Sequence, residues 1–227
     1  MISGPAAVLP ERRCDLADRP GQGCRPLRPL AAPCGATTIG VHQANVEGVA
    51  MTANDIAIAM QRAKRVLQRH PEMALHDDAP ATARWQGGTR IVSSHANGIH
   101  LSTDMPGELG GSGDQVTPGW LFRAGLASCF ATCIAMGAAD EGIELTTLEV
   151  LATSRSDSRG LLGVRDANGK AVFAGPSEVR LHVRIGAHNA TAERLKALVK
   201  SSQPCSPIPN AVQCATPVAV HIDIDVG

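Results

Sequence analysis

Two segments of the chain carry apolar residues at the spacing of an amphipathic helix. The first covers residues 55–68, with apolar side chains at Ile56, Met60, Ala63 and Leu67. Asn54 is its expected N-cap, and His70-Pro71 ends it because a residue before proline avoids helical dihedral angles. The second covers residues 190–202, with Asn189 as its expected N-cap. Both patterns predict helices with a single apolar stripe.

A third segment, between Thr117 and Asp140, is predicted to form the central helix. Thr117 suits the N-cap position, Pro118 suits the first helical position, and Gly142 is expected to terminate the helix. The many Ala, Gly, Ser and Cys residues predict a thin helix that neighbouring elements can approach closely. The glycine-rich residues 107–113 predict a flexible connection before it.

Alternation of apolar and polar residues predicts strands in much of the remaining chain. Strands are expected over residues 89–95, 99–103, 145–154, 179–185 and, as an edge strand, 218–226. Asn97-Gly98 is typical of a tight hairpin turn between the first two, and Asn168-Gly169 marks an irregular or hairpin segment. Helices and strands are mixed in order, so the pattern predicts an α+β domain.

The chain divides into three parts by composition. Residues 1–50 are dense in Pro and Arg and lack apolar periodicity, which predicts a disordered N-terminal extension. Its cysteines, Cys14, Cys24 and Cys34, have no close cysteine or histidine partner of the kind that a zinc site needs. Residues 51–78 are predicted to form an N-terminal helix and a linker, and residues 79–227 the α+β domain.

Charge and composition argue against several classes of partner. The 21 Lys and Arg residues are balanced by 21 Asp and Glu residues, so the chain has no net positive charge to attract nucleic acid. Its two Trp and three Phe, with no Tyr, are too few to stack on bases, so a nucleic-acid partner is not expected. No apolar run approaches the roughly 20 residues that cross a bilayer, so no membrane partner is expected. The N-terminus lacks the pattern of a signal peptide, so the expected compartment is the reducing cytoplasm, where the seven cysteines stay thiols.

The candidate chemistry rests on Cys129, in the middle of the predicted central helix, and on the distant Cys205. Such a pair suits peroxide reduction better than metal binding. The attacking species is the thiolate, which an apolar helix interior disfavours. Because a helix dipole acts only within the first turn, a cation must come from elsewhere. Arg123 lies well around the helix, whereas Arg90 or Arg84 could reach across, and the residues alone leave this choice open.

Other interpretations of the reactive side chains are weaker. Cys133 and Cys214 are expected to be core residues, because a free cysteine usually packs as a small apolar group. His182 and His221 fall on the polar side of the strand alternation, and no HExxH or CxxC motif is present, so no metal or other cofactor is expected. A hydrolase based on Ser128 lacks the Gly-x-Ser-x-Gly turn.

Several short motifs together resemble the OsmC/Ohr family. They are Trp85-Gln-Gly-Gly, Gly98-Ile-His-Leu-Ser-Thr-Asp, Gly107-Glu-Leu-Gly-Gly, Thr117-Pro, Leu121-Phe-Arg-Ala-Gly-Leu-Ala-Ser-Cys-Phe, the Asp157-Ser-Arg-Gly turn, the helix over residues 192–199 and Cys205-Ser-Pro. The resemblance covers about residues 82–226. It implies an OsmC-like α+β fold, in which an antiparallel sheet packs on a central buried helix and a second helix, and it implies an intertwined homodimer.

The same resemblance implies thiol-dependent reduction of organic hydroperoxides, with electrons supplied by a dithiol. It gives Cys129 the role of the peroxidatic thiol, Cys205 that of the resolving thiol, and Arg90 that of the cation that stabilises the thiolate. The apolar residues expected near Cys129, which are Leu126, Phe130 and Met136, would favour alkyl hydroperoxides over hydrogen peroxide.

Two positions depart from the family pattern. Gly119 stands where the family has a glutamate that orients the arginine. Ser206 separates Cys205 from Pro207, whereas the second cysteine of the family directly precedes the proline, so the equivalent position is either Cys205 or Ser206. Two alternatives stay open: a catalytically degenerate dimer that binds a small apolar ligand or a partner, and a single-thiol enzyme that an external thiol resolves.

Overall fold

The computed structural model describes residues 52–225, and the predicted extension over residues 1–50 lies outside them. The helices are α1 (Ala53–Arg69), α2 (Pro118–Asp140), α3 (Ser158–Leu161), α4 (Ala192–Ser202) and α5 (Pro207–Gln213), with short 3-10 turns η1 (Pro71–Ala74), η2 (Gly107–Leu109) and η3 (Gln203–Cys205). The strands are β1 (Thr82–Trp85), β2 (Ile91–Ser94), β3 (His100–Thr103), β4 (Leu145–Arg155) and β5 (Glu178–Ala187). Strands β1–β2–β3 form one antiparallel sheet and β4–β5 another, which confirms the predicted α+β class.

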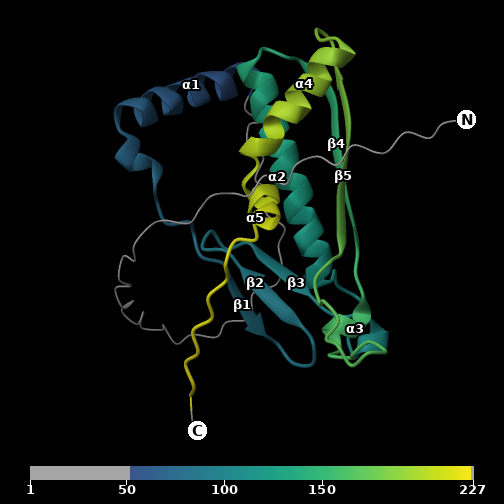
Figure 1. Ribbon diagram of the computed structural model, residues 1–227. Coiled ribbons are helices and arrows are strands. Elements are labelled where there is room, and N and C mark those ends of the chain that lie inside the picture. The colour runs from purple at the N-terminus through teal and green to yellow at the C-terminus, as the bar shows by residue number, and fades with distance from the viewer. Residues whose placement is uncertain (1–51, 226–227) are drawn as a thin grey trace, which may run out of the picture. The chain divides into compact units, whose positions relative to one another are not determined.

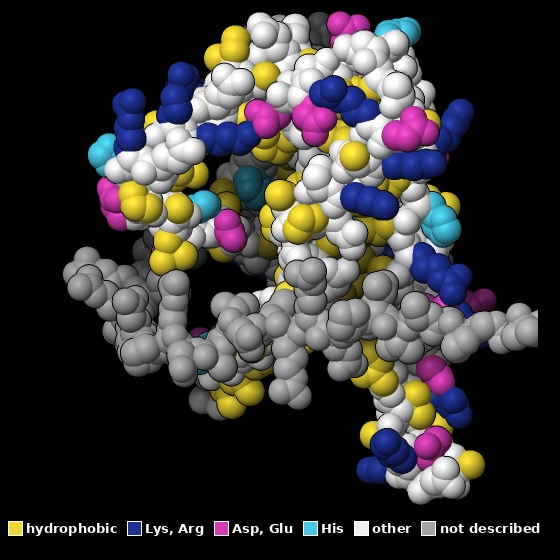
Figure 2. Space-filling view, turned by 45° about the horizontal axis from the view of Figure 1, so that its top comes forward, with side chains coloured by type: hydrophobic (Ala, Val, Ile, Leu, Met, Phe, Trp, Pro, Cys, Tyr) yellow, Lys and Arg dark blue, Asp and Glu magenta, His cyan; other side chains and the backbone are white. Residues whose placement is uncertain are grey.

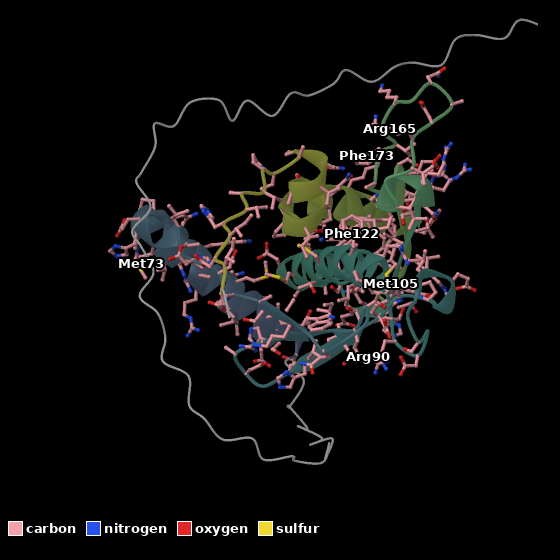
Figure 3. The ribbon with its side chains drawn as sticks, turned by 90° about the horizontal axis from the view of Figure 1, so that it is seen from below. Met73, Arg90, Met105, Phe122, Arg165 and Phe173 are labelled. Atoms are coloured by element: carbon pink, nitrogen blue, oxygen red, sulfur yellow. The ribbon has the colours of Figure 1, made fainter. Side chains whose placement is uncertain are left out.

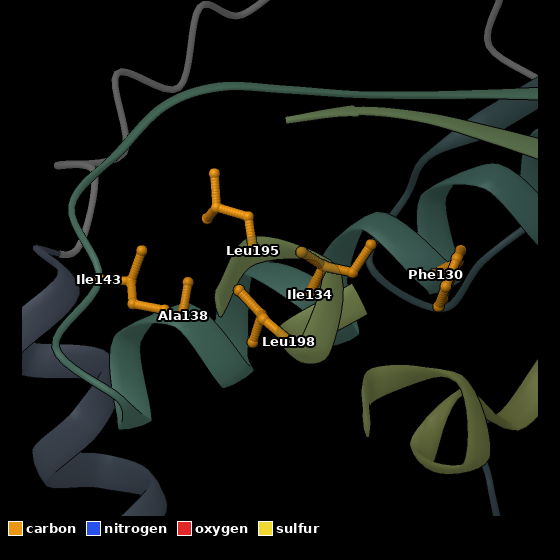
Figure 4. Packing of buried hydrophobic residues seen from close by; sticks show 6 residues of the cluster. All are labelled: Phe130, Ile134, Ala138, Ile143, Leu195 and Leu198. Atoms are coloured by element: carbon orange, nitrogen blue, oxygen red, sulfur yellow. The ribbon is translucent and has the colours of Figure 1, made fainter. Parts of the chain in front are cut away.

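The core forms where α2 and α4 pack against the β4–β5 sheet (Figure 1). Its buried side chains are Phe130, Ile134 and Ala138 of α2, Ile143, and Leu195 and Leu198 of α4 (Figure 4). Alternate residues of the two strands pack against this cluster, among them Val150, Leu181 and Val183. Full burial of one such side chain contributes about 1.5–3 kcal/mol, so this cluster is what holds α2 in place.

The ends of α2 follow the residues that predict them. The Thr117 side chain accepts a hydrogen bond from the Trp120 amide at 3.2 Å, and Pro118 occupies the first turn. Beyond the last turn Gly142 adopts a φ of +65°, a conformation that favours glycine and closes the helix. The helix therefore has its predicted bounds and carries Cys129 about halfway along its length.

The predicted N-cap of α1 is wrong by two residues. The helix begins after Thr52, not after Asn54. The Thr52 side chain accepts from the Asp55 amide, and the Asp55 carboxylate accepts from the Thr52 amide at 3.1 Å. This reciprocal capping box satisfies two backbone N–H groups at once, which a lone Asn54 cap cannot do.

The predicted N-cap of α4 is wrong in the same way. Thr191 accepts from the Arg194 amide, and the helix begins at Ala192. Asn189 instead accepts from the Glu144 amide at 2.8 Å and donates to the Gly142 carbonyl at 2.9 Å. The side chain that looked like a cap therefore ties the start of α4 to the end of α2.

The predicted hairpins are confirmed. Strands β2 and β3 pair with Ser94 opposite His100, and Gly98 takes a φ of +87° in the turn between them. The segment between β4 and β5 contains the turn predicted at Asn168-Gly169. These two hairpins supply all the paired strands of the described chain except β1, which adds to the edge of β2.

The β1–β3 sheet is left uncovered in the described chain. Trp85, Ile99 and Leu101 are 71%, 65% and 40% exposed. Among the elements within residues 52–225, α2 makes its main contacts with α1, β4, α4 and α5, and not with this sheet. A small sheet needs a packed apolar face to be stable. Residues 52–225 by themselves do not provide one.

The strand predicted over residues 218–226 does not form within residues 52–225. The segment is extended and alternates, but Val218, Val220, Ile222 and Ile224 are each 77–88% exposed. The prediction is wrong for the single chain because a strand requires a hydrogen-bonded neighbour, which alternation alone does not supply.

The expectation that no apolar run approaches membrane-spanning length is also wrong. Helix α2 has 23 residues and is long and apolar enough, by length and composition, to cross a bilayer. A helix in the core of a folded domain passes the same test, and α2 provides half of the core cluster. Only 22% of its apolar window is buried in the described chain, and hydrophobic side chains also show on the surface in Figure 2.

Candidate functional site

The sulfur of Cys129 lies where α2 meets the start of α5. Its Sγ atom is 3.4 Å from the Ser206 hydroxyl oxygen, and the Ile208 amide donates to it at 3.5 Å. Cys129 is half-buried, whereas Ser206 is completely buried. A hydroxyl and an amide N–H are groups that can hydrogen-bond an anionic sulfur. The sulfur is therefore surrounded by polar donors and not by hydrocarbon alone.

Two proline-containing turns place Ser206 against this sulfur. Pro204 lies in η3 and Pro207 begins α5, with Ser206 extended between them at φ −92° and ψ 107°. The Asn210 side chain fixes the junction by donating to the Pro204 and Ser206 carbonyls, both at 2.9 Å. Ser206 therefore faces inward while the preceding Cys205 is exposed. Of the two candidates for the second position, Ser206 is the one that contacts Cys129.

Cys133 is a half-buried member of the same site and not the core residue that was expected. It lies one helical turn after Cys129, and its thiol donates to the Cys205 carbonyl at 3.4 Å. Burial raises the pKa of Cys133, the Ser206 hydroxyl opposes this rise, and the neighbouring Cys129 and Cys205 sulfurs add to it. Cys129 and Cys133 thus border the Ser206 hydroxyl, and with the neighbouring Cys205 they form a thiol cluster.

Arg90 lies just before β2 (Figure 3), where one guanidinium nitrogen contacts three side chains. Nη2 donates to Asp104 at 3.3 Å, to the Ser112 hydroxyl oxygen at 2.8 Å and to Asp114. Cys129 is not among its hydrogen-bond or ion-pair partners in the described chain. The single chain therefore does not bring the predicted cation into contact with the thiol.

Asp104 is buried at the centre of this network. It accepts hydrogen bonds from the Thr89 hydroxyl at 2.5 Å, the Met105 amide at 2.8 Å and the Ser112 hydroxyl at 2.6 Å. These donors, the Ser112 hydroxyl first, hold the pKa of Asp104 well below its usual range. A carboxylate with this many donors stays ionised and keeps its place.

Asp114 completes the ion pair. Its contact with Arg90, and secondly with the Ser112 hydroxyl, lowers the pKa of Asp114 to about 2. In turn Asp114, followed by Asp104, raises the pKa of Arg90. The guanidinium is therefore fixed by two carboxylates even though Gly119 replaces the glutamate that the resemblance implied for this task.

The glycine-rich residues 107–113 allow Ser112 to reach Asp104. Rather than a loose connection, they form η2 and a turn in which Gly111 backs onto the Met105 carbonyl. A Cβ atom on Gly111 would lie 1.7 Å from that oxygen, so a larger residue cannot take this path.

Arg123 and Arg84, the other candidates for the cation near Cys129, have different neighbours. Arg123 donates to the Ser154 hydroxyl oxygen on β4 at 3.3 Å, and Arg84 is exposed on β1. His182 and His221 are exposed, as predicted. No group of three or more His, Cys, Asp or Glu side chains within residues 52–225 is arranged to hold a metal ion.

Comparison with known families matches the region that holds this site. Residues 111–221 match the family model described as OsmC-like protein. These residues, the OsmC-like domain, are similar to that family. The match contains the whole thiol cluster, from Cys129 to Ser206. No curated relative matches the chain.

Solved structures of several proteins are similar to this chain. The OsmC-like protein of Mycoplasma pneumoniae is 16% identical, with a TM-score of 0.51 over 61% of this chain and 89% of that chain. An organic hydroperoxide resistance protein from Elizabethkingia anophelis is 26% identical, with a TM-score of 0.47 over 61% and 89%. The organic hydroperoxide resistance protein OhrB of Bacillus subtilis is 21% identical, with a TM-score of 0.40 over 60% and 90%. The first of these supports the fold of the OsmC-like domain, not its activity.

A groove of about 340 Å³, lined mainly by apolar side chains, lies between α2, α4, α5 and β5 of the OsmC-like domain, and no cysteine of the described chain lines it. Leu126 and Phe130, which flank Cys129 on α2, line it together with Pro209 and Val212 of α5 and residues of β5 and α4. Met136, the third apolar residue expected near Cys129, is 39% exposed and does not line it. The groove therefore borders the same two helices that hold the Cys129 sulfur.

Asp104, Ser112 and Asp114 were not among the site residues predicted from the sequence. Asp104 does end one of the motifs that carry the family resemblance, and that was the available signal. Nothing in the spacing shows that Ser112 folds back onto Asp104, with Asp114 in contact with Ser112. That approach depends on the turn at residues 107–113.

Proposed function

We propose that this protein reduces organic hydroperoxides with Cys129 as the attacking thiol. The observation that carries the proposal is the position of its sulfur, which contacts two polar groups and lies on the helix whose Leu126 and Phe130 line the apolar groove. Such a site accommodates a peroxide oxygen at the sulfur and an alkyl chain against Leu126 and Phe130. The OsmC-like domain supports the same substrate class.

The first step needs only Cys129 and the substrate. The Cys129 thiolate attacks the distal oxygen of the hydroperoxide, the O–O bond breaks, and the leaving alkoxide takes a proton to become an alcohol. The sulfur is oxidised to a sulfenic acid. A cytoplasmic dithiol is the proposed source of the two electrons that restore the thiol.

We infer that the active form is a homodimer. The β1–β3 sheet, the α2 residues Trp120 and Met136, and residues 217–225 expose apolar side chains that a folded chain normally covers. A second copy of the chain would cover the sheet and offer the alternating C-terminal segment a strand to pair with. The same arrangement would allow Arg90 of one copy to approach Cys129 of the other, which is the role predicted for this guanidinium.

Turnover of cumene hydroperoxide with a dithiol tests this function. We expect Cys129→Ser to abolish it and Arg90→Met to lower kcat/KM by about 10²-fold, because a fixed cation at the reacting sulfur is lost. Arg84→Met, on the exposed strand β1, is the matched control and should leave the rate unchanged. A wild-type rate no faster than that of Cys129→Ser would eliminate the enzyme.

The position of Ser206 favours a second candidate, a degenerate OsmC-like protein that binds an apolar ligand. A hydroxyl, which cannot form a disulfide, stands in contact with Cys129. This candidate predicts no peroxide turnover but saturable binding of an apolar fluorescent probe in the groove. Phe130→Ala should weaken that binding, whereas Phe173→Ala, at a side chain 72% exposed, should not.

A further inference from the structure

We propose that Cys133 and Cys205 together take over the task of the second thiol. In this relay Cys133 resolves the sulfenic acid on Cys129, and the disulfide then passes to the exposed Cys205. The relay rests on the proposed function, since a sulfenic acid must first form at Cys129.

The contact position next to Cys129 is occupied by an oxygen. Ser206 Oγ is 3.4 Å from the Cys129 sulfur and is completely buried, so no sulfur reaches Cys129 from this side. Cys205 is adjacent in sequence, but its side chain is exposed and Cys129 is not among its hydrogen-bond partners in the described chain. A resolving thiol must therefore come from another element.

Cys133 is that thiol. It lies on α2 four residues after Cys129, and both sulfurs border the Ser206 hydroxyl. Cα atoms four residues apart on an α-helix are separated by about 6 Å, which falls inside the range of disulfides. A disulfide within one helical turn is strained, and strain makes it easier to reduce. The Cys129–Cys133 bond would therefore be short-lived.

Cys205 is placed to receive that disulfide. The Cys133 thiol donates to the Cys205 carbonyl at 3.4 Å, and the Cys205 sulfur lies near enough to influence the Cys133 thiol, so the two residues are already neighbours. Cys205 is exposed while Cys129 and Cys133 are half-buried. An external dithiol can reach a Cys133–Cys205 disulfide more readily than one formed deeper on α2.

Each step of the relay is balanced. The Cys133 thiol attacks the sulfur of the Cys129 sulfenic acid, an S–S bond forms and the S–O bond breaks, and water leaves with the thiol proton. The Cys205 thiolate then attacks the Cys133 sulfur, which releases Cys129 as a thiolate. A dithiol reduces the Cys133–Cys205 disulfide and becomes a disulfide itself.

The order of disulfides can be mapped in the full-length chain. Trypsin leaves Cys129 and Cys133 in one peptide, residues 124–155, and Cys205 with Cys214 in another, residues 201–227. A Cys214→Ser chain makes the second peptide unambiguous. After one equivalent of cumene hydroperoxide and timed quenching with N-ethylmaleimide, we expect peptide 124–155 to lose two hydrogens first. It should then become linked to peptide 201–227 through Cys133.

Two variants divide the relay at its two steps. In Cys133→Ser, the Cys129 sulfenic acid should accumulate and be trapped by dimedone. Dithiol-dependent turnover of this variant should be slower than that of the wild type by at least about tenfold. In Cys205→Ser, oxidation should stop at the disulfide within peptide 124–155. Circular dichroism checks that both variants fold. If either variant does not fold, the order of disulfides in the Cys214→Ser chain, which retains all three cysteines of the relay, still decides whether the relay operates.

The contrary results are distinct from one another. A direct Cys129–Cys205 disulfide that forms at the same rate in Cys133→Ser overturns the relay. The relay is also overturned if a chain that retains Cys133 and Cys205 forms the dimedone adduct at Cys129 but no disulfide. In that case the peroxidase function stands. If no adduct forms at Cys129 in any variant, the relay and the proposed function fail together.

Discussion

At the scale of single residues, the site depends on the direction in which two neighbours face. Ser206 is completely buried and touches Cys129, whereas Cys205 is exposed, although one peptide bond separates them. The turn between η3 and α5 decides this, because the prolines on either side restrict the backbone. A one-residue difference from the family motif thus changes which atom the Cys129 sulfur meets.

Ser206→Cys should restore a direct partner for Cys129. The introduced sulfur would stand where an oxygen now lies 3.4 Å from Cys129, so a disulfide between them needs little movement. We expect peroxide to produce this bond, seen by peptide mapping, even when Cys133 is also replaced by serine. Ser201→Cys, at an exposed position on α4, is the control and should form no bond to Cys129. Sulfenic acid that persists in Ser206→Cys would contradict this geometry.

Asp104 should make stability depend on acid pH. Its pKa is lowered in the folded protein, so its contribution is full above the unfolded value of about 4 and is lost as pH falls through the lower folded value. We expect Asp104→Asn to destabilise the protein at pH 7 and the difference from wild type to shrink toward pH 2. Urea midpoints at several pH values measure this. Asp77→Asn, at an exposed site, should cause no such trend.

At the scale of elements, α2 serves both as the core helix and as the carrier of Cys129 and Cys133. One side of it, with Phe130, Ile134 and Ala138, packs against α4 and the β4–β5 sheet. Cys129 and Cys133 lie on the adjoining side, toward η3 and α5. The same packing that stabilises the helix therefore sets the distance between its sulfurs and Ser206.

Ile134→Ala should destabilise the protein strongly, because Ile134 is 0% exposed in the core cluster. The expected loss is about 2–5 kcal/mol in the free energy of unfolding, from lost burial and the cavity left behind. Ile58→Ala on α1, where the side chain is 56% exposed, makes the same chemical change and should cost less than about 0.5 kcal/mol. Chemical denaturation followed by circular dichroism compares them, and equal losses would show that α2 does not form the core.

At the scale of the whole molecule, the described chain has apolar surface without a cover. The β1–β3 sheet exposes Trp85, and residues 217–225 expose four alternating aliphatic side chains. Arg90 is held by carboxylates and has no contact with Cys129 within the described chain. The proposed second copy would account for all three observations. It would bury the apolar sheet and the C-terminal segment, and it would give Arg90 and Cys129 new neighbours.

The dimer is testable at the C-terminal segment. Val220→Lys should shift the protein toward the monomer in analytical ultracentrifugation and lower peroxide turnover in parallel, because a charge is costly in a buried strand. His221→Lys adds the same charge on the opposite side of the strand and should have a smaller effect. A wild-type protein that sediments as a monomer at micromolar concentration while keeping full activity would exclude this assembly.

The local features of the fold were accessible from the sequence because they depend on neighbouring residues. Thr117, Pro118 and Gly142 predicted the ends of α2, and Asn97-Gly98 predicted a hairpin, since caps and turns are short-range. Asn54 is not the N-cap of α1 because Thr52 and Asp55 cap that helix together. Asn189 is not the N-cap of α4 because its side chain bonds to the Glu144 amide after α2, a contact that residue spacing does not reveal.

The sequence by itself determined the α+β class, the central helix and the cysteine on it, because periodicity and local hydrogen bonding specify them. Only the tertiary structure decided that Ser206 meets Cys129, that Cys133 joins Cys205, and that Asp104 and Asp114 hold Arg90. These contacts join residues far apart in the chain, or depend on which way one side chain of a turn faces. Such distances arise from packing, and no spacing along the chain encodes them.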